Sequence, residues 1–71
     1  MVNVNKLKGR FVEEGKTVAD VAENIGIDKG TLYRKLNNPE QITIREADAM
    51  AKFLNLSVDD AVAIFFSEYV A

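Results

Sequence analysis

Four helix-capping residues divide the chain, and each stands directly before apolar residues that recur at helical spacing. A polar side chain that accepts a hydrogen bond from the first turn favours the start of a helix at that point. These residues are Thr17, Asp28, Thr43 and Ser57. Glu46 follows Thr43 at the spacing of a capping box. The pattern predicts a chain built from short helices that begin at defined positions.

An earlier apolar series, Val4, Leu7 and Phe11, adds a first helix that ends near Gly15, a residue type suited to a left-handed cap. Pro39 separates the third helix from the fourth, because it can continue neither. The expected helices cover residues 3–14, 18–25, 29–37, 44–54 and 58–69. With no strand-like run of useful length, we expect an all-α, five-helix bundle that forms a single domain over residues 1–71.

The side-chain inventory argues against catalysis. The sequence contains no Cys and no His, which removes the thiolate, the commonest general base and the commonest transition-metal ligand. Neither Ser57 nor Ser67 has an evident base to activate it. Asp59 and Asp60 are read as first-turn acids that favour the helix dipole rather than as a metal site. We therefore expect no enzyme activity, no cofactor, no metal and no small-molecule ligand.

Neither a membrane span nor a secretory signal is evident. The longest apolar run, residues 61–66, is far shorter than the roughly 20 residues that a spanning helix needs. The first residues lack the positive-then-apolar order of a signal peptide. A cytoplasmic location without membrane contact is the expectation.

Charge is unevenly distributed along the chain, although the net charge is only −2. Residues 1–36 carry seven basic and five acidic side chains, a balance of +2. Residues 37–71 carry two basic and six acidic side chains, a balance of −4. An anion-binding face is therefore to be sought in the first half.

Residues 17–36 have the features of two short helices joined by a tight turn. Small Ala22 lies where the second helix must approach the first closely, and Gly26 lies at the turn, where a positive φ favours glycine. Ile25, Ile27 and Leu32 form an apolar wedge between the helices. This arrangement predicts a helix-turn-helix whose second helix presents its outer face.

Two stretches then carry a family resemblance. Gly30-Thr31-Leu32-Tyr33-Arg34-Lys35-Leu36-Asn37 and Leu54-Asn55-Leu56-Ser57 resemble segments of the lambdoid phage repressor and Cro (Xre-like) domains. The resemblance extends from the first helix through Ser57, with the motif at about residues 17–37, and implies a lambda-repressor-like bundle that binds duplex DNA. One departure is Lys35, where the family usually has an apolar residue.

The resemblance also implies which side chains meet DNA. By position, the base-reading candidates are Lys29, Gly30, Thr31, Tyr33 and Arg34, and the phosphate-contacting candidates are Thr17, Lys35, Asn37 and Asn38. Each has a plainer alternative. The basic residues can form a solvated helix face, Thr17 can serve only as a cap, and the Tyr33 ring can pack on the neighbouring helix. Asp28 begins the same helix face, and it can likewise serve only as an N-cap.

The last helix has more apolar residues than one core-facing stripe requires. A stripe of Val58, Ala61 or Val62, Phe65 and Tyr69 is expected to face the core. The remaining apolar residues, predicted to form a dimer interface, are Phe53, Ile64, Phe66 and Val70. The alternative is that a broadly apolar helix is buried more completely within one chain.

Two functions follow from these features. The first is a Cro- or repressor-like transcriptional regulator of phage or prophage origin, which binds double-stranded operator DNA as a homodimer at least when on DNA. The second is a protein-interaction module, such as an antirepressor or adaptor, in which the apolar last helix binds a partner and the helix-turn-helix is only a scaffold. The net negative charge favours the second slightly.

Overall fold

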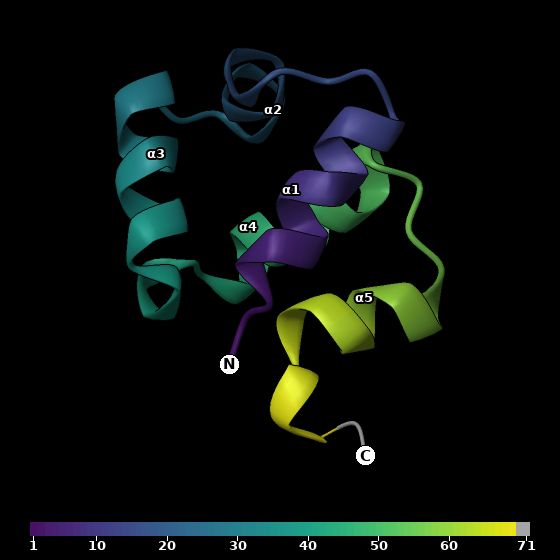
Figure 1. The fold of residues 1–71 in the computed structure, drawn as a ribbon. Coiled ribbons are helices and arrows are strands. Elements are labelled where there is room, and N and C mark those ends of the chain that lie inside the picture. Colours follow the sequence, from purple (N-terminus) through teal and green to yellow (C-terminus); the bar gives the residue numbers. More distant parts are fainter. Residues whose placement is uncertain (70–71) are drawn as a thin grey trace.

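The computed structural model describes residues 1–69, and these residues form five α-helices, two short 3-10 turns and no strand. The α-helices are α1 (Val4–Glu13), α2 (Val18–Ile25), α3 (Lys29–Asn37), α4 (Ile44–Phe53) and α5 (Val58–Phe65). The 3-10 turns are η1 (Pro39–Gln41) and η2 (Ser67–Tyr69). Figure 1 shows α3 at one edge of the bundle beside α2, with α5 at the far end. The prediction of an all-α, five-helix bundle is confirmed.

The predicted caps account for most helix starts. Thr17 with Asp20, and Thr43 with Glu46, each form a reciprocal capping box in which both backbone amides have a side-chain acceptor. Ser57 accepts a hydrogen bond from the Asp60 amide at 3.1 Å. Asp28 occupies the N-cap position of α3 in an extended conformation, but its side chain accepts no hydrogen bond there. The start of α3 thus lacks the side-chain cap found at the other four α-helices of the described chain.

The core lies between the helices and receives residues from all five. Its buried members are Leu7, Phe11, Val21, Ala22, Leu32, Leu36, Met50, Leu54, Ile64 and Phe65. Ala22 is only 1% exposed, as expected for a small residue at a close helix crossing. Within residues 1–69, no helix is both long and apolar enough to cross a bilayer.

The last helix differs from its prediction in length and in the face it buries. It ends at Phe65 rather than Tyr69, and Phe66 has left the helical conformation, with φ at −129°. Val58 and Tyr69, both expected in the core, are 80% and 78% exposed, whereas Ile64 is buried. Apolar residues cover so much of this helix that periodicity alone could not select the buried face.

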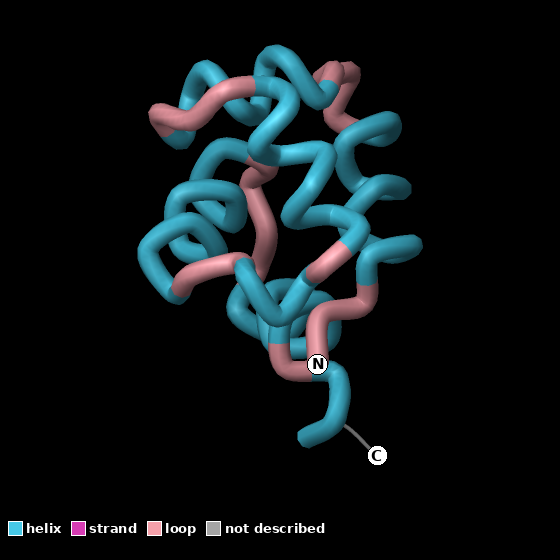
Figure 2. Tube along the Cα trace, turned by 90° about the vertical axis from the view of Figure 1, so that its left-hand side faces the viewer, coloured by secondary structure: helices cyan, strands magenta, loops and turns pink. Residues whose placement is uncertain are grey.

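Contacts with the start of the chain help to set that face. The Asn3 amide donates to the Ile64 carbonyl at 2.6 Å, and the Ser67 hydroxyl and amide donate to the Met1 carbonyl. Figure 2 shows the first residues and the η2 turn at the same end of the molecule. Because α1 covers one side of α5 and α4 approaches another, the buried stripe runs between these two neighbours.

Candidate nucleic-acid interface

Helices α2 and α3 form the predicted helix-turn-helix. Gly26 ends α2 with φ at 81°, a left-handed conformation that a side chain would disfavour. The Ile27 amide donates to the Ala22 carbonyl at 3.0 Å and closes the turn. Helix α3 is anchored by Leu32 and Leu36, which are 0% and 4% exposed. Since these two residues share one face of the helix, the opposite face is directed away from the core.

The five predicted base-reading residues lie together on α3. Lys29, Gly30, Tyr33 and Arg34 are exposed, and Thr31 is half-buried. Tyr33 retains half of its accessible surface, so its ring is not a core residue. Within residues 1–69, Lys29 and Arg34 form no ion pair. Two cationic side chains and two hydroxyl groups are therefore wholly or partly accessible between the first residue of α3 and its outer side.

Arg10, another basic residue of the first half, is held by acids. Arg10 lies 3.3 Å from a Glu13 oxygen, 3.6 Å from a Glu14 oxygen and 3.8 Å from an Asp60 oxygen. This cluster ties α1 to α5 and leaves the arginine partly buried. The charge of Arg10 is therefore less available to an anion than the charges of the exposed Lys29 and Arg34.

Thr17, a predicted phosphate contact, is exposed at the start of α2 and belongs to a capping box. The Thr17 amide donates to Asp20 at 2.9 Å, and the Asp20 amide donates to the Thr17 hydroxyl at 3.0 Å. The hydrogen bonds from the Thr17 backbone and hydroxyl, with the nearby charge of Lys16, hold the pKa of Asp20 below its ordinary value. An anion that approaches this helix end meets the amides of Val18 and Ala19, which precede the boxed amide.

Asn37 and Asn38, also predicted phosphate contacts, lie at the end of α3. Asn37 is exposed, whereas Asn38 is half-buried. The Asn38 side-chain amide donates to the Arg34 carbonyl at 3.0 Å and so satisfies a carbonyl of the last turn. One of the two asparagines therefore already has a structural partner.

Lys35 does not project into solvent as its predicted phosphate contact would require. Its ammonium lies 2.8 Å and 2.7 Å from the two carboxylate oxygens of Glu46, and the side chains are only 15% and 12% exposed. The lysine is turned toward α4 because a carboxylate is available there at the first turn of that helix. Glu46 is a residue of this region that the sequence analysis placed only in a capping box. The sequence signal for this contact was Lys35 itself, a charged residue where the family usually has an apolar one, because a partly buried ammonium needs an acidic partner.

The three predicted dimer residues that the structure describes, Phe53, Ile64 and Phe66, do not form one surface. Phe66 is 44% exposed, but Ile64 is 3% exposed and belongs to the core, so it is not available to a partner. Phe53 is half-buried beneath Lys16, whose ammonium lies 4.9 Å from the ring centroid. Val70 lies outside the described residues. Of the predicted interface residues within the described part of the chain, Phe66 alone has the exposure that a dimer contact requires.

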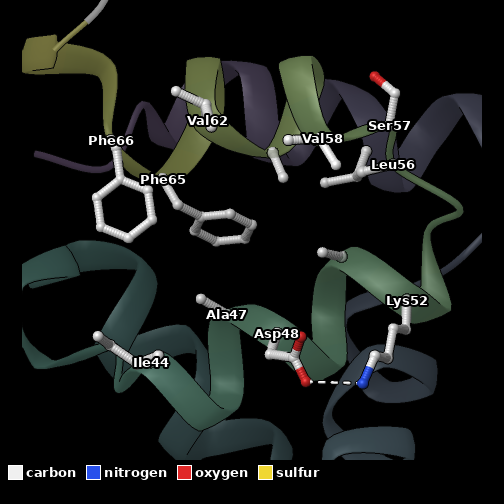
Figure 3. Close-up of a pocket in the computed structure, with 12 residues that line it drawn as sticks. Ile44, Ala47, Asp48, Lys52, Leu56, Ser57, Val58, Val62, Phe65 and Phe66 are labelled. Carbon is white, nitrogen blue, oxygen red and sulfur yellow. Dashed lines mark hydrogen bonds and ion pairs between the residues drawn. The ribbon is translucent and has the colours of Figure 1, made fainter.

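An apolar groove lies between α4 and α5, with a volume of about 380 Å³. Figure 3 shows Phe65 and Phe66 extending from α5 toward α4, with Ala47 on the opposite wall. The exposed Ile44 and Val58 continue the apolar lining. Asp48 and Lys52 form an ion pair of 3.0 Å at its edge. The exposed apolar surface is therefore built from α4 and α5 together.

Comparison with known proteins adds a family assignment to this geometry. The family model described as the Cro/C1-type HTH DNA-binding domain matches residues 6–66, which include all of α2 and α3. Comparisons with curated proteins and with solved structures found no match. Within residues 1–69, no group of three or more metal-ligating side chains lies close enough to hold an ion.

Proposed function

Because the chain belongs to the Cro/C1-type HTH DNA-binding domain family, we propose that it is a sequence-specific transcriptional regulator that inserts α3 into the major groove of operator DNA. The observation that carries the proposal is the outer face of α3. Arg34 is exposed on this face, and Lys29 is exposed at the first residue of the helix; neither forms an ion pair in the described chain, while Leu32 and Leu36 anchor the face opposite Arg34.

In this proposal, α3 reads the bases and the two ends of the motif bind the backbone. Arg34 and Lys29 have the chemistry to donate to the O6 and N7 acceptors of guanine, and Thr31 and Tyr33 to contact a thymine methyl or a phosphate oxygen. Thr17, Asn37 and Asn38 lie at helix ends, from which they would fix the orientation of the domain. The net charge of −2 does not oppose this arrangement, because binding depends on the local potential.

We further propose that the protein binds as a homodimer through the groove between α4 and α5. Val58, Val62 and Phe66 are 80%, 37% and 44% exposed along that groove, which is unusual for large apolar side chains. A two-fold dimer places two recognition helices about 34–36 Å apart, one turn of DNA, and so doubles the contacts of a small domain. The resemblance to small phage regulators supports a phage or prophage origin.

The test is selection of bound duplexes from a random pool, followed by titration of single-base variants of the selected operator at fixed salt. A bidentate arginine contact is worth about 1–3 kcal/mol of base discrimination. Arg34→Ala should therefore abolish preference at one base pair in each half-site. Lys8→Ala removes the same charge from an exposed position on α1 and should leave base preference unchanged. Equal losses on all operator variants for Arg34→Ala would exclude it as a reading residue.

The groove also supports the second function, a protein-interaction module in which a partner helix occupies the space between α4 and α5. The two functions differ in their response to DNA. The regulator keeps its operator preference against excess competitor DNA, and its affinity falls steeply with salt. The interaction module binds no duplex with sequence preference.

A further inference from the structure

The ion pair between Lys35 and Glu46 joins the recognition helix to the next helix. Lys35 lies in the C-terminal half of α3, and Glu46 lies in the first turn of α4. The ammonium contacts both carboxylate oxygens, at 2.8 Å and 2.7 Å. Since the side chains are only 15% and 12% exposed, solvent screens this pair much less than a surface pair.

The carboxylate is itself held in place. The Thr43 amide donates to Glu46 Oε1 at 2.9 Å, and the Glu46 amide donates to the Thr43 hydroxyl at 3.1 Å. Burial raises the pKa of Glu46, but the hydrogen bonds from Lys35 and Thr43 and the lysine charge outweigh it, so the pKa lies below its ordinary value. Lys35 thus meets a fixed, ionised acceptor rather than a mobile surface acid.

The pair supplies a constraint that the apolar anchors of α3 lack. Leu32 and Leu36 hold the helix by non-directional contacts along one stripe. Charge-assisted hydrogen bonds to two oxygens are directional, and Lys35 lies beside that stripe. Rotation of α3 about its axis would draw the Lys35 ammonium away from the Glu46 carboxylate as well as move the two leucines. Arg34 is the adjacent residue, so its direction changes with the same rotation.

We propose that Lys35 and Glu46 are positioning residues for base reading, whose ion pair fixes the rotation of α3 and thereby the direction of Arg34. This inference rests on the proposed function. It gives Lys35 a role opposite to that of a phosphate contact, because the ammonium acts from the protein side of the helix. The paired lysine also neutralises a carboxylate that would otherwise stand unpaired beside the DNA-binding helix.

The experiment uses Lys35→Met, Glu46→Gln and the double variant, each measured where circular dichroism shows it fully folded. Gln still accepts the Thr43 amide hydrogen bond, so Glu46→Gln removes the charge and retains the cap. Affinity is measured for the selected operator and for a random duplex over a salt series. Amide hydrogen exchange of α3 in the free protein is followed by NMR. Lys8→Met, at an exposed position of α1, is the matched control, and Lys35→Arg is the conservative variant.

Each single variant should lower the ratio of operator to random-duplex affinity roughly 3- to 30-fold, the range for residues that act through other contacts. The double variant should lose no more than the larger single loss, because the two residues act as one unit. The salt dependence on the random duplex should not change, and exchange in the last turn of α3 should become faster. Lys35→Arg should retain the ratio, and Lys8→Met should leave it unaltered.

A phosphate contact gives the opposite pattern. Lys35→Met would then weaken both duplexes alike and lower the salt slope by about one per subunit, and Glu46→Gln would tighten binding by releasing the ammonium. Either result overturns the positioning role, as does an unchanged ratio with unchanged exchange. If the unmodified protein fails to distinguish the operator from the random duplex, the proposed function is refuted, and the positioning role of Lys35 and Glu46 is refuted with it. An unchanged ratio in the variants of a discriminating protein refutes only the positioning role.

Discussion

Gly30 offers a test that separates stability from recognition. It lies in the first turn of α3, it is exposed, and no atom lies within 4 Å of the position that a Cβ would occupy. Alanine is favoured over glycine in helices by up to about 1 kcal/mol, and less at a helix end. Gly30→Ala should therefore stabilise the free domain slightly, by no more than ~4–8 °C in melting temperature.

The same methyl group should weaken DNA binding if α3 approaches the bases as proposed. It would stand between the helix backbone and the groove, and withdrawal of the helix would cost at least one base contact. A good base contact is worth about 1–3 kcal/mol, so operator affinity should fall roughly 5- to 150-fold. Gly9→Ala is the matched control, because Gly9 lies in α1 and a Cβ there also meets nothing within 4 Å.

Melting curves and operator titrations of the two variants test whether Gly30 lies against DNA. Gly9→Ala should gain stability and keep its affinity, whereas Gly30→Ala should gain stability and lose affinity. If both bind the operator as tightly as the unmodified protein, Gly30 does not lie against DNA and the reading face has been assigned to the wrong part of α3.

Two further perturbations address association and the Lys35–Glu46 pair. Phe66→Glu should leave the chain folded, since Phe66 is 44% exposed, and it should shift a dimer to monomer in analytical ultracentrifugation. An unmodified protein that is monomeric at high concentration, both free and on DNA, would exclude the dimer. Glu46→Gln should be less stable than the unmodified protein at pH 7 by about 1–3 kcal/mol in urea denaturation. The stability difference between Glu46→Gln and the unmodified protein should shrink as the pH falls below 4.5, because a carboxyl whose pKa is lowered on folding stabilises the fold only while it is ionised. A stability difference independent of pH would contradict this role for the Glu46 charge.

The sequence predicted the helices well where local chemistry determines them. The two Thr capping boxes and the Gly26 turn depend on residues close together in the chain, so their signals are complete in the sequence. The end of α5 and its buried face depend on the Asn3 amide, the Met1 carbonyl and the flanking helices. Long-range contacts of this kind cannot be recognised from neighbouring residues in the sequence. In a helix that is apolar on most sides, the spacing of apolar residues also does not identify the buried face.

In the candidate site, too, some features could be predicted from nearby residues and others depend on contacts with distant ones. The outer face of α3 could be inferred from the positions of Leu32 and Leu36, because burial of one helix face determines the exposure of the other. The sequence placed Lys35 among the phosphate-contacting residues, and it could not say what the lysine ammonium meets in the folded chain. A carboxylate eleven residues away was needed to answer that, and it came from a different helix.

Lys35 shows how a departure from a pattern can be used. A lysine beside the apolar stripe of a short helix is costly to bury alone, so its presence implies either an exposed ammonium or an ionised partner. The capping box already required Glu46 to point back toward the start of α4, where the end of α3 arrives. One carboxylate therefore serves the start of one helix and the orientation of another. A substitution at Glu46 should then disturb base reading although, in this proposal, Glu46 itself contacts no base.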